Sequence, residues 1–223
     1  MDERIRQAGR LYELAVFSGD AGPLAEADRE LDAAEADLAV ARGRLMHARF
    51  LLRRDQDPDA AGEIPDELPL FERAAALYRS LGDARGEAAA LFWVGCFHQV
   101  IGRDNATAVP VLERSLELAA GAGDKAVMAE TLRHLGIAAH FGGQPEAARQ
   151  RLEESTRLRR ELGHLPGAAA NMVGLAYVAA AQGRGDDARA ILDEAAALAQ
   201  AGHASRILAQ VSEAREAIGE PRR

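Results

Sequence analysis

FERA (71–74), LERS (112–115), LEES (152–155) and LDEA (192–195) are four related tetrapeptides that begin 41, 40 and 40 residues apart. Glycines follow them in phase, each of them succeeded by Asp or His: Gly82, Gly123, Gly163 and Gly202. Glycine just past the last turn of a helix adopts the left-handed conformation that other residues take only at a steric cost. We therefore predict a helix end at each glycine, and an internal repeat of about 40 residues.

Each period has room for two helices. In the third unit, residues 125–141 carry apolar side chains at helical spacing, and Gly142-Gly143 breaks the pattern. Pro145 then suits the first turn of a second helix, where its missing N–H has no intrahelical partner to lose. One helical hairpin cannot bury its own apolar face, whereas stacked hairpins can. The sequence therefore predicts an all-α fold, an α-solenoid.

Composition and charge exclude several classes of protein. The 223 residues are 48% apolar and 28% charged, with one cysteine and a formal net charge of −8. The apolar fraction is too high for a disordered chain, and one cysteine cannot form a disulfide framework. An acidic balance disfavours direct nucleic-acid binding through phosphate contacts. Because residues 1–10 lack the apolar core of a signal peptide and no apolar run could span a membrane, we expect a cytoplasmic protein without a membrane partner.

The repeat resembles the tetratricopeptide repeat (TPR). In that family the first helix of each repeat (helix A) and the second (helix B) cross at small residues, and glycine lies at the turn between them. Matching positions here are Gly95, Gly102, Ala108 and Ser115; Gly136, Gly143, Ala148 and Ser155; and Ala176, Gly183, Ala188 and Ala195. The resemblance implies a right-handed α-solenoid of TPR-like helical hairpins. The period of about 40 residues resembles the long repeats of actinobacterial regulators, and HEAT-type repeats, which share the period, fit the small residues less well.

We expect a single domain over residues 1–223. It comprises an N-terminal helical hairpin (1–54), a loop (55–65), the repeats (66–203) and a C-terminal capping helix (204–218). The long helix of the hairpin, residues 23–54, has leucines seven residues apart with alanines between them: Leu31, Leu38, Leu45 and Leu52. This stripe either packs within the chain against Ile5, Leu11, Tyr12 and Ala15 of the first helix or forms a dimer seam. We accordingly expect a monomer or a weak homodimer.

The sequence holds little that indicates catalysis, a cofactor or a metal. Two glycine patterns, at 121–126 and 183–188, match the loose dinucleotide fingerprint, but they fall at helix–helix turns instead of following a strand. Cys96 lies in an alanine-rich helix, where a cysteine is usually a small buried apolar residue. His98, His134 and His140 lie on A helices without the spacing of metal ligands on one helix, so their convergence depends on the fold.

The resemblance implies that A helices line a concave groove. The family's groove positions carried over to this chain are Phe92, Cys96, Gln99, Arg133, Ile137, His140, Val173 and Tyr177, with Arg49 added from the N-terminal helix. Apolar and aromatic side chains with a few polar groups are typical of binding sites. The first functional hypothesis is a non-enzymatic module that binds a protein or peptide in this groove. The alternatives are a regulator that senses a small anionic or aromatic ligand, and an enzyme that uses the groove His and Arg residues.

Overall fold

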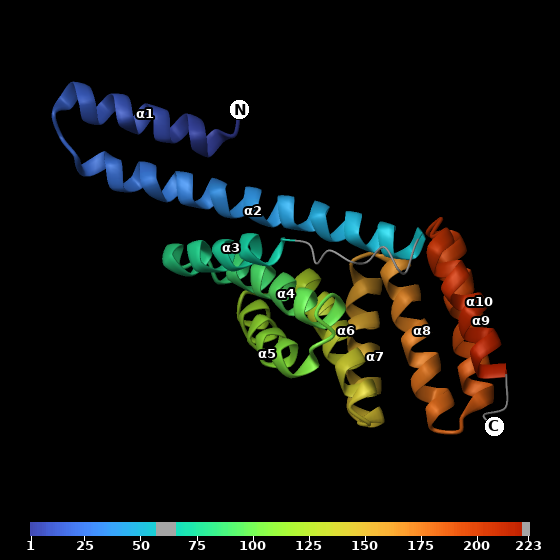
Figure 1. Ribbon diagram of the computed structural model, residues 1–223. Helices are drawn as coiled ribbons and strands as arrows, with labels where there is room; N and C mark the ends of the chain where they lie inside the picture. Colours follow the sequence, from blue (N-terminus) through green and yellow to red (C-terminus); the bar gives the residue numbers. More distant parts are fainter. Residues whose placement is uncertain (57–65, 220–223) are drawn as a thin grey trace. The chain divides into compact units, whose positions relative to one another are not determined.

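The computed structural model describes residues 1–56 and 66–219, which form ten helices and, within those ranges, no strand (Figure 1). The predicted all-α, TPR-like solenoid fold is confirmed. The helices divide into two compact units, residues 1–122 and 123–223. The loop expected at 55–65 falls largely on residues 57–65, outside the described ranges, and the single domain stays a prediction.

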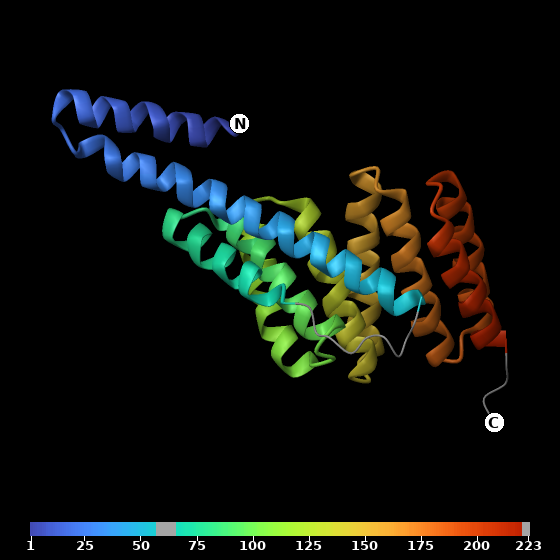
Figure 2. The ribbon, with the colours of Figure 1, turned by 45° about the horizontal axis from the view of Figure 1, so that its top comes forward.

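The first unit stacks a long hairpin and three further helices. They are α1 (Glu3–Ser18), α2 (Gly22–Gln56), α3 (Leu68–Leu81), α4 (Ala84–Val100) and α5 (Asn105–Gly121). α2 packs against α1 over its first half and against α3 further along, as Figures 1 and 2 both show. Ala36 and Ala39 of α2 meet Ala74 and Tyr78 of α3 in one apolar core.

The second unit continues the repeat. Its helices are α6 (Lys125–Phe141), α7 (Pro145–Glu161), α8 (Leu165–Ala181), α9 (Gly185–Ala201) and α10 (Ser205–Gly219). α6 and α8 are A helices, and α7 and α9 are B helices. α10 packs against both α8 and α9, where Val211 and Ala214 bury themselves beside Ala176 and Leu192. This helix covers the apolar edge of the last repeat, as the sequence predicts for a capping helix.

Glycine determines the turns, with one correction. Gly82, Gly123 and Gly163 have φ of 71°, 65° and 69° and so adopt the predicted left-handed conformation. For Gly202 the prediction is wrong: its φ is −89°, and His203 takes the left-handed position with φ 51°. An ideal Cβ on Gly202 would lie 2.9 Å from Cγ of Pro166, so a close approach between α8 and the end of α9 accounts for this glycine.

The small residues at the helix crossings act as predicted. An ideal Cβ on Gly95 would lie 2.6 Å from Cγ of Leu112, and one on Gly136 would lie 2.9 Å from Cγ of Leu152. Both leucines are fully buried. Helix A therefore approaches helix B closely because it carries no side chain at the crossing, and leucine fills the space beside it.

The N-terminal hairpin forms, but its two helices do not pack together through the leucines that recur every seven residues. α1 contacts α2 through Leu11 and Ala8, which pack on Ala27. Of the other side chains expected in this contact, Ala15 is buried, whereas Ile5 and Tyr12 are exposed. The leucines at 31, 38, 45 and 52 are also exposed, so the first of the two alternatives, packing within the chain, is wrong, and the dimer seam stays a prediction. The helix meets α1 through alanine instead because the short side chain lets the two backbones approach.

None of the described helices combines the length and the apolar character needed to cross a lipid bilayer.

Candidate functional site

The side chains predicted to line the groove fall into both units. In the first unit Arg49 is exposed and Gln99, half-buried, donates a hydrogen bond to Oδ1 of Asn105 across 3.0 Å. Phe92 and Cys96 are buried, so neither presents a surface to a partner in this structure. The structure therefore does not place these four residues as one accessible lining.

The second unit presents a more coherent surface on its A helices. Arg133, Ile137 and His140 of α6 are partly exposed, and Tyr177 of α8 is 37% exposed. Val173 of α8, also predicted, is buried. α6 and α8 contact each other directly, so the four accessible side chains belong to neighbouring helices of one unit.

Arg133 is held by a buried relay of hydrogen bonds. Its Nη1 donates to Oδ1 of Asn171 across 3.0 Å, and Nδ2 of Asn171 donates to Oγ of Ser155 across 2.7 Å. The Ser155 hydroxyl in turn donates to the carbonyl oxygen of Ala129 across 2.5 Å. Asn171 and Ser155 are fully buried, so the relay ties α6, α7 and α8 together and fixes one end of the guanidinium.

Phe141 extends this surface and was missed from the sequence. Its side chain is 76% exposed, and its ring lies edge-on to the His140 imidazole with centroids 5.6 Å apart. Phe141 is the last residue of α6 and precedes Gly142. A phenylalanine at a helix end can be exposed or can pack against the following helix, so its exposure does not follow from the sequence. The signal that could have identified Phe141 is its position between His140, a predicted groove residue, and the Gly142-Gly143 pair.

A second cation in this unit is structural. Arg159 of α7 is buried, pairs with Glu130 across 2.6 Å and donates to the carbonyl oxygen of Gly167 across 2.7 Å. Burial lowers the pKa of Arg159, and Glu130 partly offsets that effect. This pair links α6, α7 and the start of α8, so Glu130 is engaged in holding the repeat together.

A groove of about 550 Å³ lies over the B helices of the second unit. Its apolar floor comprises Met172 and Leu175 of α8 and Ile191 of α9. Arginine and glutamate side chains form the rim, chiefly from α7: Arg149, Glu153, Arg157, Arg160, Glu161, Arg184 and Glu194. The sequence did not single out this groove, because its rim consists of ordinary helix-surface charges.

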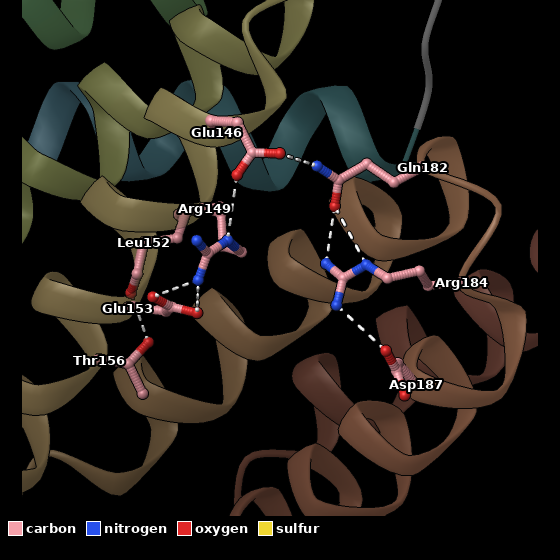
Figure 3. Close-up of polar contacts among 8 residues, drawn as sticks. All are labelled: Glu146, Arg149, Leu152, Glu153, Thr156, Gln182, Arg184 and Asp187. Carbon is pink, nitrogen blue, oxygen red and sulfur yellow. Dashed lines mark hydrogen bonds and ion pairs between the residues drawn. The ribbon is translucent and has the colours of Figure 1, made fainter.

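The rim charges are largely engaged with one another. Figure 3 shows Arg149 paired with Glu153, and Arg184 bonded to Gln182 and to Asp187. Gln182 also donates to Oε1 of Glu146 across 2.7 Å, which joins the end of α8 to α7. A ligand in this groove would therefore meet paired charges above an apolar floor.

A buried cluster in the first unit joins Cys96 to a histidine. His47 Nδ1 lies 2.7 Å from Oε1 of Glu67, and His47 Nε2 lies 3.9 Å from Sγ of Cys96. All three side chains are buried, and Oε2 of Glu67 has no hydrogen-bond partner among the residues that the structure describes. The prediction that Cys96 is a buried residue is confirmed. Its contact with His47 of α2, and the contact of His47 with Glu67 just before α3, were not predicted, because these residues are far apart in the sequence.

The other histidines do not form a described metal site. His98 lies in the first unit, and His134 and His140 lie on α6 of the second. Among residues 1–56 and 66–219, no group of three or more His, Cys, Asp or Glu side chains is arranged to hold a metal ion.

Comparisons with known proteins agree with this architecture. A sequence model of the tetratricopeptide repeat matches residues 97–161. Two crystal structures of TPR-like repeats from a putative kinesin light chain of Podosopora anserina are 17% and 19% identical, with TM-scores of 0.55 and 0.53. They cover 79% and 78% of this chain, and the alignments span 87% and 88% of theirs.

A third solved structure, BtubC (BKLC) from P. vanneervenii, is 18% identical with a TM-score of 0.55. The match covers 91% of this chain and 90% of that one. No curated protein matches the sequence significantly. At these identities the structural matches establish the fold and nothing finer. Residues 97–161 thus match the tetratricopeptide repeat, and the chain has the TPR-like α-solenoid fold, which generally provides protein-interaction modules.

Proposed function

We propose that this chain is a non-enzymatic interaction module that binds a protein or peptide segment on the A-helix surface of its second unit. The surface comprises Arg133, Ile137, His140, Phe141 and Tyr177. The observation that carries the proposal is the orientation of Arg133 by Asn171, whose side chain is fully buried. Arg133 is partly exposed, and a cation that a buried amide already orients loses little conformational entropy when it binds an anionic group.

The chemistry of this surface favours a partner with a carboxylate or phosphate next to an aromatic or aliphatic side chain. Guanidinium groups bind such oxyanions through charge-assisted hydrogen bonds, which are about twice as strong as neutral ones. The exposed rings of Phe141 and Tyr177 offer apolar area with few rotatable bonds. Aromatic residues and arginine are the types that most often dominate binding energy at interfaces.

The test compares three forms of the full chain in a pull-down from the native host with mass-spectrometric identification. The parent chain and Arg189→Ala, a control at an exposed arginine of α9 outside both candidate surfaces, should capture the same partner. Arg133→Gln removes the charge but keeps a donor for Asn171, and it should lower affinity for the purified partner about tenfold or more. Equal affinity for the parent and Arg133→Gln would place binding elsewhere.

A small-ligand regulator is the second candidate, and the groove over the B helices is the observation that favours it. Its volume of about 550 Å³ suits a drug-sized molecule, and Met172, Leu175 and Ile191 provide apolar contact. Mass spectrometry of freshly purified, denatured protein should then detect a stoichiometric small molecule. Leu175→Arg should abolish its retention, whereas Arg133→Gln should not.

A further inference from the structure

A stripe of exposed leucines runs along α2, and we call it the leucine stripe. Its side chains are 42% to 59% exposed and recur every seven residues: Leu24, Leu31, Leu38, Leu45 and Leu52. At about 1.5 Å of rise per residue, the stripe is about 42 Å long. A row of exposed leucines of this length is typical of a protein–protein contact, because isolated monomers rarely expose large apolar patches.

Alanines complete a coiled-coil pattern. Each of them follows a leucine by three residues: Ala27, Ala34, Ala41 and Ala48. Leucine therefore occupies position a of a heptad and alanine position d, the two positions that meet a partner helix. Ala41 and Ala48 are exposed, so the second half of α2 presents the complete pattern. Small d residues allow a facing helix to come close, with leucine filling the space.

The charges that flank this seam change sign along the helix. Positions e and g are acidic in the first half of α2, with Asp28, Glu30, Glu35 and Asp37, and basic in the second half, with Arg42, Arg44 and Arg49. In coiled coils these positions determine which partner is bound and in which direction it runs. The pattern therefore identifies the facing helix by its charge.

A parallel copy of α2 fits this pattern poorly. In a parallel pair, each g residue faces the e residue five positions later in the other chain. Glu30 would face Glu35 of the second copy, and Arg44 would face Arg49 of the second copy. Two of the three charged pairs along the seam would thus be repulsive, and each would occur twice by symmetry.

An antiparallel copy fits better. There, e faces e and g faces g, so Glu35 meets Arg42 of the second copy and Asp37 meets its Arg44, while Glu30 faces Leu51. Asp37 already pairs with Arg4 across 2.7 Å, and Arg44 lies over the Trp93 ring, so the pairing of Asp37 with Arg44 adds to existing contacts. The same register places the three central leucines opposite exposed or partly exposed alanines, with Leu31 facing Ala48, Leu38 facing Ala41 and Leu45 facing Ala34. We therefore propose that the chain forms an antiparallel homodimer in which α2 packs along the leucine stripe of a second copy.

A further charged pair in the antiparallel register, Asp28 with Arg49 of the second copy, adds an independent argument for the dimer. Among the residues that the structure describes, neither Asp28 nor Arg49 has an ion-pair partner, and the same is true of Arg42. Glu35 does pair with Arg73 across 2.7 Å, but both side chains remain half-exposed and leave room for a second cation. The dimer thus supplies counter-charges to Asp28, Arg42 and Arg49, whereas Glu35 and Asp37 already have partners within the chain.

The N-terminal helix supports the same interface. α1 packs on Ala27, so at that end a second copy of α2 would meet the edge of α1 as well as α2. α1 exposes apolar side chains of its own, including Ile5, Tyr12 and Val16. Because α1 covers Ala27, the seam is narrower at that end than at Ala41 and Ala48, which are exposed. The closest approach of the two copies is therefore expected at the middle of α2, around Leu38.

Light scattering and sedimentation of the full chain test the dimer. We expect a concentration-dependent dimer, which Leu38→Glu converts to a monomer while the circular dichroism spectrum and melting temperature stay near those of the parent. Leu162→Glu, at an exposed leucine outside the stripe, is the matched control and should remain dimeric. A parent chain that is monomeric over the whole concentration range overturns the proposal.

Charge reversal tests the pairing. Arg42→Glu should weaken the dimer about tenfold or more, because it faces Glu35 of the second copy at two symmetric places. The double variant Glu35→Arg with Arg42→Glu should restore it. Failure of this rescue in a folded double variant would contradict the antiparallel register.

Engineered cysteines test the direction. In the antiparallel register, position 31 faces position 48 of the second copy. Mixed Leu31→Cys and Ala48→Cys chains should therefore form a mixed disulfide under mild oxidation, and neither variant should cross-link to itself. The parent chain, whose Cys96 is buried, is the control. Self-cross-linking of each single variant would show a parallel pair and overturn the proposed direction.

Discussion

Asn171 of α8 accepts a hydrogen bond from Arg133 of α6 across 3.0 Å. The contact joins the A helices of two successive repeats and couples a partly exposed cation to a fully buried amide. Both groups benefit: the amide oxygen is not left unpaired in the interior, and the guanidinium keeps one orientation. The same bond therefore contributes to stability and prepares the proposed binding surface.

Asn171→Leu should destabilise the second unit and weaken partner binding together. Leucine has a similar volume but leaves the Ser155 hydroxyl and Arg133 without the amide, which costs about 1–3 kcal/mol in a buried position. Urea denaturation monitored by circular dichroism measures the loss. Gln150→Leu, on the exposed face of α7, should leave the free energy of unfolding nearly unchanged. Equal stability of Asn171→Leu and the parent would contradict a structural role of the relay.

Gly95→Ala should destabilise the first unit. The added methyl would lie 2.6 Å from Cγ and Cδ2 of Leu112, so the two helices must separate or the leucine must leave its rotamer. Overpacking of this kind costs about 1–3 kcal/mol. Leu112→Ala alone should also destabilise, because it leaves a cavity.

The double variant Gly95→Ala with Leu112→Ala gives the decisive comparison. Because the methyl then occupies part of the space that the leucine left, the double variant should lose less free energy of unfolding than the sum of the two single losses. Additive losses would show that the two positions are not in contact.

The repeat positions could be predicted from the sequence because their cause is local. A left-handed turn at Gly82 depends only on the backbone of that residue, and a close crossing at Gly136 depends on the absence of one side chain. These constraints recur at a fixed period and so are visible in one sequence. Gly202 was misassigned because glycine serves both purposes, and only the neighbouring Pro166 decides between them.

The contacts of the candidate sites could not be predicted because they join distant segments. Asn171 lies 38 residues from Arg133, and His47 lies 49 residues from Cys96. Neither pair follows from the helical period. Asn171, moreover, lies on an otherwise apolar helix, where a buried amide gives no indication of which partner it will find. The position of Arg133 on an A helix could be predicted from the repeat and its family resemblance. Its hydrogen-bond partner, Asn171, could not.

Ala148→Trp should unfold much of the second unit. Ala148 is fully buried at the crossing of α7 with α6, in the core that contains Leu152 and Val178. An indole there requires the helices to move apart, at a cost of about 1–3 kcal/mol or more. Thermal melting followed by circular dichroism measures this, and Gln150→Trp, two residues away and exposed, should melt with the parent. Unchanged melting of Ala148→Trp would mean that the repeat phase is misplaced.

The Cys96 thiol should react only when the first unit opens. It is buried beside His47, which in turn bonds to Glu67, so a thiol reagent has no direct access. Ellman's reagent should label the native chain slowly. Glu67→Ala leaves the ring of His47 without its carboxylate partner, at a cost of about 1–3 kcal/mol. If labelling follows the equilibrium population of the open form, its rate should then rise about 5- to 150-fold. Glu72→Ala, exposed on α3, should label as slowly as the parent. Rapid labelling of the native parent chain would show an accessible thiol next to a base, and it would favour the enzyme hypothesis over the binding module.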